Sequence, residues 1–379
     1  MNGAASSADR LTRAFIHLDR LTHNVRLLQN AVGHRSLWPV IKADAYGHGA
    51  EIVAHHLLRL GYNTFGVADV EEAVALRQAG IDTTIITLSA TLPEHSEALV
   101  ACGCEPVVCT EEMVEALARA AERAGRRVAV HVKVDTGMGR VGIRPDDVLA
   151  FLDRCRAYPA LRLRGLMSHF PRADEADKTF SREQIGCFRR IVEVTARYGI
   201  EVRHMANSAA LLDLPDSHFD AVRPGIALYG LPPSAAIANP RLQALKPVLE
   251  WKTRITFLKE VPAGVGLSYG HAFHTARSSL IATVPVGYAD GLHRNLSNRC
   301  DLLVRGLRCP QVGRITMDMS LLDVTALRGR VRLGDEVVII GRQDDEEITA
   351  DDLAEKLGTI NYEVVSAISH RVPRIAVGG

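Results

Sequence analysis

The sequence lacks any long apolar run and any strong excess of charge of one sign. No stretch reaches the ~18 apolar residues that a membrane span needs. The N-terminal MNGAASSADR has no apolar segment behind a positive one, as a secretory signal would. The 45 Lys and Arg residues nearly balance the 44 Asp and Glu residues, giving a formal net charge of +1. Because no basic stripe accompanies this balance, we expect no binding to nucleic acid or to a membrane surface.

Cysteine is sparse and follows no metal-binding pattern. The chain has 7 cysteines, and the nearest to one another are Cys102, Cys104 and Cys109. These three lack the CxxC spacing and the nearby histidines of a zinc site. We interpret them as reduced, mostly buried thiols of a cytoplasmic protein, and we expect no metal site.

A repeated strand-and-helix pattern fills residues 36–230. Short apolar runs alternate with amphipathic stretches such as EEMVEALARAAERAG, whose apolar residues recur at three- and four-residue spacing. The runs are SLWPVIK, TFGVAD, TTIITLS, EPVVCT, RVAVHVKVD, LRLRGLMSHF, VRHMANS and AVRPGIALYG. Strands that alternate with helices predict a parallel sheet, and eight of them suit a closed (β/α)₈ TIM barrel in an α/β protein. An open doubly wound sheet is the alternative.

The pattern changes after Pro247, where short alternating runs with glycine turns predict a second, mostly β domain. We therefore expect a flexible tail at residues 1–11, a barrel at 12–245 and a β domain at 246–379. The opening RAFIHLDRLTHNVRLLQNAVG indicates one strand and one helix. Either of these two elements can pack with the C-terminal domain.

Polar residues gather at the ends of the predicted strands. The first run, in VIKADAYGHG, delivers Lys42 to the end of a buried strand, where an unpaired charge is costly. Tyr46 follows Lys42 in the same motif, and the eighth run begins with Arg223. Polar side chains also lie at the end of the fifth, sixth and seventh runs or just after them: Lys133, Arg140, His169, Asn207 and Ser208. In a barrel these ends share one mouth, where the active site lies. As a ring, they favour a polar active site over separate structural roles.

The chemistry of this ring narrows the choice of ligand. Asn207, Ser208 and the Gly225–Ile226 turn offer polar side chains and backbone N–H groups that suit a phosphate near the last two strands. Lys42 lies across the predicted mouth, and a lysine with a lowered pKa is a Schiff-base nucleophile. A phosphate anchor opposite such a lysine is what pyridoxal 5'-phosphate (PLP) requires.

Several motifs resemble those of the alanine racemases, in that family's order. They are VIKADAYGHG, HVKVDTGMGRVG, SHF, ANSAA, VRPGIALYG, GLSYGHAF, PVGYADG, GRITMDM and INYE, and they cover nearly the whole chain from about residue 12. The resemblance implies a PLP-binding (β/α)₈ barrel followed by a β domain. It also implies a head-to-tail homodimer in which the partner's β domain completes each active site.

The resemblance implies two bases on opposite faces of the substrate. Lys42 would hold PLP and take the α-proton of D-alanine, and Tyr269 from the other subunit would serve L-alanine. His169 and Arg223 would favour the phenolate, because a free tyrosine titrates near ~10. Arg223 would also bond the pyridine nitrogen and, because arginine keeps its proton, weaken the electron sink. The product would be D-alanine for peptidoglycan.

Further roles follow from the same resemblance. The phosphate would be held by Tyr46, Ser208, Gly225, Ile226 and Tyr362. The substrate carboxylate would be bound by Arg140 and the backbone of Met317, with Asp318 beside the substrate. Lys133 would orient Arg140 and is often carbamylated in the family. Tyr288, with Tyr362 and Arg314, would form a narrow entrance that suits a methyl side chain, although interface packing explains Tyr288 and Asp318 as well.

Other readings of the chain remain open. The same fold serves racemases of other small amino acids such as serine, and PLP decarboxylases. Those decarboxylases use a Cys-Asp pair, but Cys300 and Asp301 lie outside that motif's usual setting, so we interpret Cys300 as structural. A PLP-carrying protein without activity would resemble the barrel alone. The β domain argues against that reading.

Overall fold

The computed structural model describes residues 10–379 and divides into two compact units. One unit is Leu21–Lys246, and the other holds the described residues up to Arg20 together with Pro247–Gly379. The predicted tail at residues 1–11 lies almost wholly outside the described residues. Within the described part, Arg10 donates a hydrogen bond to the carbonyl oxygen of Arg371 (2.6 Å).

The first unit is built on parallel strands that close into a TIM-like barrel. Its strands, among the described residues, are β2 (Ser36–Leu37), β3 (Thr64–Val67), β4 (Thr84–Thr87), β5 (Glu105–Val108), β6 (Val128–Lys133), β7 (Leu161–Met167), β8 (Val202–His204) and β9 (Ala221–Val222). Their order is β2-β9-β8-β7-β6-β5-β4-β3. The segment after β2 closes this sheet, because Val40 bridges Gly66 of β3 in parallel. The predicted α/β barrel is confirmed.

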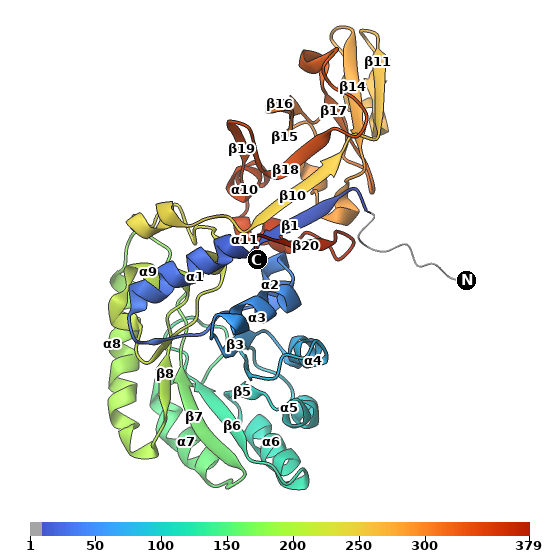
Figure 1. Cartoon of the computed structure of the whole chain (residues 1–379). Coiled ribbons are helices and arrows are strands. Elements are labelled where there is room, and N and C mark those ends of the chain that lie inside the picture. Colours follow the sequence, from blue (N-terminus) through green and yellow to red (C-terminus); the bar gives the residue numbers. More distant parts are fainter. Residues whose placement is uncertain (1–9) are drawn as a thin grey trace, which may run out of the picture. The chain divides into compact units, whose positions relative to one another are not determined.

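Helices precede the first barrel strand and connect the later ones. They are α1 (Leu18–Val32), α2 (Lys42–Gly47), α3 (Ala50–Arg59), α4 (Val70–Gln78), α5 (Ser96–Cys102), α6 (Glu111–Arg123), α7 (Val148–Arg156), α8 (Thr179–Val194) and α9 (Ser208–Asp213). Figure 1 shows α4 to α7 following one another around the outside of the strands. Side chains such as Thr110 and Asp69 cap these helices by accepting hydrogen bonds from backbone N–H groups. Inside the barrel, Trp38, Ile86, Val107 and Met167 pack as one buried cluster.

The second unit is mostly β, as predicted. Its main sheet, with the order β16-β15-β18-β10-β1-β20, contains β1 (Arg13–His17), β10 (Leu249–Arg254), β15 (Asp301–Val304), β16 (Leu307–Pro310), β18 (Glu336–Gln343) and β20 (Arg374–Val377), and β19 (Glu346–Ile348) pairs with β18. A smaller sheet holds β11 (Phe257–Val261), β14 (Ser279–Val284) and β17 (Ser320–Asp323), and β12 (Gly266–Leu267) pairs with β13 (Phe273–His274). The first strand therefore belongs to the sheet of the C-terminal unit, between β10 and β20.

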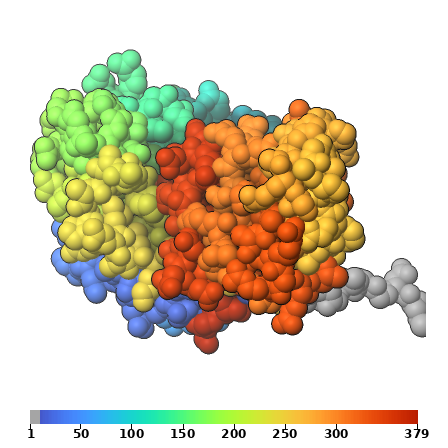
Figure 2. Space-filling model, turned by 90° about the horizontal axis from the view of Figure 1, so that it is seen from above, coloured from blue at the N-terminus to red at the C-terminus, as the bar shows by residue number. Residues whose placement is uncertain are grey.

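Two short helices, α10 (Ala350–Leu357) and α11 (Asn361–Ser366), complete this unit. Figure 2 shows the last part of the chain, in red, packed directly against the orange segment of the same unit. Val261, Leu267, Ile281 and Val312 form a buried cluster around the smaller sheet. Leu267 and Val312 of this cluster lie directly before the segments that carry Tyr269 and Arg314.

Candidate active site

Lys42 stands at the start of a left-handed turn. In α2, four successive residues, Ala43 to Tyr46, have φ between 51° and 54°. A left-handed turn costs about 1–2 kcal/mol per non-glycine residue, because Cβ approaches the following carbonyl oxygen. Such strain persists only where the surroundings fix it, and it is typical of functional sites.

The carboxylate of Glu72 in α4 anchors this turn. It accepts hydrogen bonds from the backbone N–H of Ala43 (2.6 Å) and of Ala68 (2.7 Å). Asp44 adds a bond by accepting from the N–H of Ala50 (2.7 Å). Sequence reasoning missed Glu72, since nothing in its local pattern distinguishes it from a solvent-facing helix residue.

The surroundings of Lys42 favour a neutral amine. Burial and the positive charge of Arg140 lower the pKa of Lys42, and Arg223 acts in the same direction. Glu72 partly opposes this effect by raising the pKa of Lys42. A neutral lysine can act as a nucleophile or as a base, which agrees with the role expected for this residue.

Ser208, Gly225 and Tyr46 come together as a small cradle. The Oγ of Ser208 accepts hydrogen bonds from the N–H of Gly225 (2.8 Å) and of Ala227 (3.3 Å). A Cβ on Gly225 would lie 2.2 Å from the hydroxyl oxygen of Tyr46, so only glycine lets these groups approach. Ile226 begins a 3₁₀ turn beside them. The hydroxyl groups of Ser208 and Tyr46 are donors suited to a phosphate.

Asn207 uses its side chain within the fold. Its Oδ1 accepts a hydrogen bond from the N–H of Ala210 (3.0 Å) and caps α9. The residue therefore positions the helix that begins with Ser208. A contact of Asn207 with phosphate stays a prediction.

Arg223 lies buried just after β9, with 4% of its surface exposed. Its Nη1 donates to Nδ1 of His204 (2.7 Å), and its Nη2 donates to the carbonyl oxygen of Ser168 (2.9 Å). Burial lowers the pKa of Arg223 to about 10, so the guanidinium stays charged at neutral pH. Burial and the charge of Arg223 together hold the pKa of His169 well below its usual value, which keeps that imidazole neutral.

Lys133 and His131 share one face of β6, because they are two residues apart, and both side chains are buried. Lys133 is 3% exposed. Burial and the charges of Arg223 and Arg140 lower the pKa of Lys133 to about 8. The alternation of HVK was a signal from which the inward His131 could have been predicted. Of these two residues, only Lys133 is among the predicted site residues.

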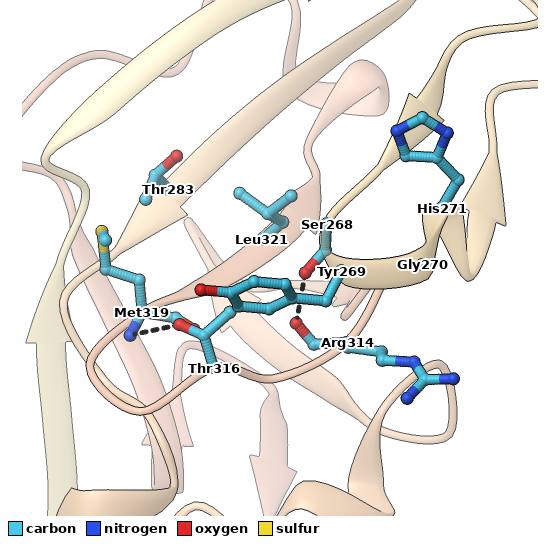
Figure 3. Close-up of a pocket in the computed structure, with 9 residues that line it drawn as sticks. All are labelled: Ser268, Tyr269, Gly270, His271, Thr283, Arg314, Thr316, Met319 and Leu321. Carbon is cyan, nitrogen blue, oxygen red and sulfur yellow. Dashed lines mark hydrogen bonds between the residues drawn. The ribbon is translucent and has the colours of Figure 1, made fainter.

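Tyr269 lies in the C-terminal unit on an exposed loop between β12 and β13. It is 72% exposed and lines a pocket of about 680 Å³ together with Ser268, Arg314 and Met319. Figure 3 shows its ring extending across this pocket, with the hydroxyl on the side of Met319 and Thr316. The Oγ of Ser268 donates to the carbonyl oxygen of Arg314 (2.7 Å), which ties the loop to the neighbouring one.

The other predicted residues of this unit lie on neighbouring loops. Tyr288 and Met317 are exposed, and their loops touch through hydrogen bonds from the N–H of Tyr288 to the carbonyl oxygen of Thr316 (3.0 Å) and from the N–H of Ala289 to that of Met317 (3.1 Å). Asp318 accepts a hydrogen bond from Arg371 (2.7 Å). Tyr362 is half-buried on α11.

The seven cysteines are free thiols. Burial raises the pKa of Cys300 to about 12, so this thiol stays neutral and unreactive at pH 7. That environment supports the structural interpretation of Cys300.

Comparison with known proteins identifies the family. The model of the alanine racemase N-terminal domain matches residues 16–233, and that of the C-terminal domain matches residues 248–376. This chain belongs to the alanine racemase family. Its membership confirms the resemblance found in the motifs and places the chain in an enzyme family of isomerases.

Individual members of the family are similar over their whole length. An alanine racemase of Halothermothrix orenii is 46% identical over 368 residues, which covers 96% of each chain. The solved alanine racemase of Streptomyces coelicolor has a TM-score of 0.92 at 38% identity, covering 99% of this chain and 100% of the other. That of Bacillus anthracis, solved with bound L-Ala-P, has a TM-score of 0.92 at 36% identity, covering 98% and 96%.

The residues of the barrel unit fit the cofactor of the family. The cradle of Ser208, Gly225 and Tyr46 offers donors for a phosphate, and Lys42 offers an amine with a lowered pKa.

Among residues 10–379, no helix is both long and apolar enough to cross a bilayer.

Proposed function

We propose that this protein interconverts L-alanine and D-alanine with PLP in the barrel unit. The observation that carries the proposal is the environment of Lys42, an amine with a lowered pKa on a strained turn. When bound, PLP withdraws electrons from the substrate and makes the α-proton acidic enough to remove. The phosphate group is held by Ser208, Tyr46, Gly225, Ile226 and Tyr362.

The chain's own residues position the substrate and move the proton. Arg140 and the backbone of Met317 bind the carboxylate of alanine, with Asp318 beside it. Nζ of Lys42 removes the α-proton of D-alanine, and Oη of the partner subunit's Tyr269 removes that of L-alanine. In each direction the other residue, in its protonated form, donates a proton to the opposite face of the α-carbon, which inverts the configuration.

A homodimer supplies the second base in this proposal. Tyr269, Tyr288, Met317 and Met319 are all exposed large side chains of the C-terminal unit. Such a concentration of exposed apolar groups is typical of an interaction surface. A second copy of the chain that covers this surface brings Tyr269 to its partner's Lys42. Tyr288, with Tyr362 and Arg314, then narrows the entrance to favour a methyl side chain.

The biological role follows from this chemistry. D-alanine is a component of peptidoglycan, and we propose that the protein supplies it in the cytoplasm.

Exchange of the α-proton in D₂O tests the reaction. The protein with PLP is given L-alanine, D-alanine or L-serine, and deuterium content and chirality are followed. We expect inversion with deuterium in the product from either isomer of alanine, and slower turnover of serine. Exchange without inversion would contradict the two-base mechanism, and the absence of exchange would contradict the function.

Two variants assign the bases. Lys42→Ala should abolish activity, and Tyr269→Phe should lower kcat at least about 100-fold in both directions, since each direction needs both bases. Tyr158→Phe, in the loop before β7, is the matched control and should racemise normally. Normal racemisation by Tyr269→Phe would show that another group is the second base.

A further inference from the structure

A chain of hydrogen bonds runs from Arg223 through the barrel to Glu105. Nη1 of Arg223 lies 2.7 Å from Nδ1 of His204, and Nε2 of His204 lies 2.9 Å from Nδ1 of His131. Nε2 of His131 then lies 3.0 Å from Oε2 of Glu105, at the first residue of β5. Arg164 forms an ion pair with the same carboxylate oxygen (2.8 Å). This hydrogen-bond chain therefore connects Arg223, at the carboxyl ends of the barrel strands, to Glu105, at the amino end of β5.

The direction of this chain is fixed by its two ends. Arginine can only donate, so Nδ1 of His204 must accept and its Nε2 must carry the proton. His131 in turn accepts at Nδ1 and donates from Nε2 to the carboxylate of Glu105, which can only accept. Both imidazoles are then neutral Nε2–H tautomers.

The electrostatics of the two histidines agree with this direction. Burial lowers the pKa of His131 despite the opposing hydrogen bond to Glu105. Burial and the charge of Arg223 hold the pKa of His204 well below its usual value. Both rings are fully buried, so neutral imidazoles are the stable form at pH 7.

The fold makes room for these rings. A Cβ on Gly165 would lie 1.9 Å from Nδ1 of His131, so β7 needs a glycine there. The pairing of β6 with β7 shifts register between Val130 and His131. Trp38 packs edge-on against both imidazoles, with ring centroids 4.9 Å from His204 and 6.0 Å from His131. The backbone and the core side chains thus accommodate this hydrogen-bond chain in the barrel interior.

We propose that Glu105 is a positioning residue of the active site, which acts on Arg223 through His131 and His204. Because its carboxylate accepts from Nε2 of His131, the Nδ1 atoms of both histidines are acceptors, and Nδ1 of His204 accepts from Arg223. This bond orients the guanidinium so that it can donate to the ring nitrogen of the cofactor. A donor in place of Glu105 would reverse the chain, so that an N–H of His204 would face an N–H of Arg223. The inference rests on the proposed function for the role of Arg223.

Neutron diffraction from deuterium-exchanged crystals of the PLP-loaded protein tests the direction itself. We expect deuterium on Nε2, and none on Nδ1, of both His131 and His204. Deuterium on Nδ1 of either ring would overturn the proposal. This measurement needs no turnover, so it separates the two claims: wild-type protein that fails to exchange the α-proton of alanine contradicts the proposed function, whatever the map shows.

Three variants test the effect on the reaction. Glu105→Leu removes the acceptor and should lower kcat about tenfold or more with little change in KM, by analogy with outer hydrogen-bond partners at metal sites. Glu105→Gln keeps an acceptor oxygen and should recover most of the activity. Glu201→Gln is the matched control and should behave as wild type. Oε2 of Glu201 lies 3.5 Å from Nη1 of Arg164, but Glu201 is not part of the hydrogen-bond chain.

An unchanged kcat in a folded Glu105→Leu protein would overturn the proposal, as would a loss in Glu105→Gln equal to that in Glu105→Leu. If Glu105→Leu does not fold, the neutron map of the wild type and the kinetics of Glu105→Gln still decide.

Discussion

At the scale of single residues, the site depends on two lysines whose pKa is lowered by burial and by neighbouring arginine charges. Burial is the largest cause of the lowered pKa of Lys42 and of Lys133, and the charges of Arg140 and Arg223 act in the same direction on both lysines. For a lysine, both effects favour the neutral amine, whereas Arg223 keeps its charge at pH 7. The same cluster therefore contains reactive amines and a fixed guanidinium.

Lys133 offers a test of this effect. Its pKa of about 8 leaves about a tenth of the amine neutral at pH 7, and the neutral amine is the form that adds CO₂ to give a carbamate. With ¹³C-labelled bicarbonate we expect a carbamate signal in ¹³C NMR that weakens as the pH falls from 8 to 6. Lys133→Met should lose the signal and raise KM for alanine roughly tenfold, because in our proposal the carbamate is the group that orients Arg140.

The control is Lys259→Met, at an exposed lysine of β11, which should keep the signal. A carbamate signal that survives in Lys133→Met would place the modification elsewhere.

At the scale of elements, the left-handed turn of α2 is the unusual feature. No sequence pattern predicted it, since the residues of ADAY are ordinary in right-handed helices and strands. Contacts from α4 hold the turn, through Glu72, and these arise only once the chain has folded. By contrast, α6 ends at Arg123, two residues before Gly125, and a glycine at this place is typical of helix ends, so local sequence already defines the end of this helix.

Replacing Ala43 by glycine tests the strain in this turn. Ala43 is exposed and has a φ of 51°, so Ala43→Gly should raise the free energy of unfolding by about 1 kcal/mol as the unfavourable Cβ contact is removed. Urea unfolding measures the change. Ala75→Gly, at an exposed position of right-handed α4, is the control and should lose about 1 kcal/mol. Destabilisation of equal size in both variants would contradict the strain at Ala43.

At the scale of the whole molecule, the proposal divides one active site between two chains. A symmetric dimer with this arrangement has two equivalent sites, each with Lys42 from one subunit and Tyr269 from the other. The two bases can therefore be removed from different chains and tested together.

Mixing two inactive variants tests this division. When Lys42→Ala and Tyr269→Phe chains are co-expressed, half of the dimers are hybrids, and each hybrid has one site with both bases intact. We expect about a quarter of the wild-type activity. Co-expression of two differently tagged Lys42→Ala chains should give none. Purified hybrids without activity would show that both bases come from one chain.

Much of the fold and part of the site were readable from the sequence. The alternation of apolar runs and amphipathic stretches predicted the barrel and the β domain, and the strand-end positions identified Lys42, Lys133 and Arg223. Glu105 and His204 escaped notice, since a charged residue at the start of a strand and a histidine near its end are also common without any function. Their connection depends on neighbouring strands that are far apart in the sequence.

The sequence by itself determined the strand-and-helix order, the residues at the strand ends and the family, because these depend on local pattern and on residue identity. Only the tertiary structure decided the pairing of β1 with β10 and β20, the left-handed turn and the hydrogen-bond chain behind Arg223. The physical reason is that each of these depends on contacts between segments distant along the chain, which exist only when the strands have paired and the core has closed.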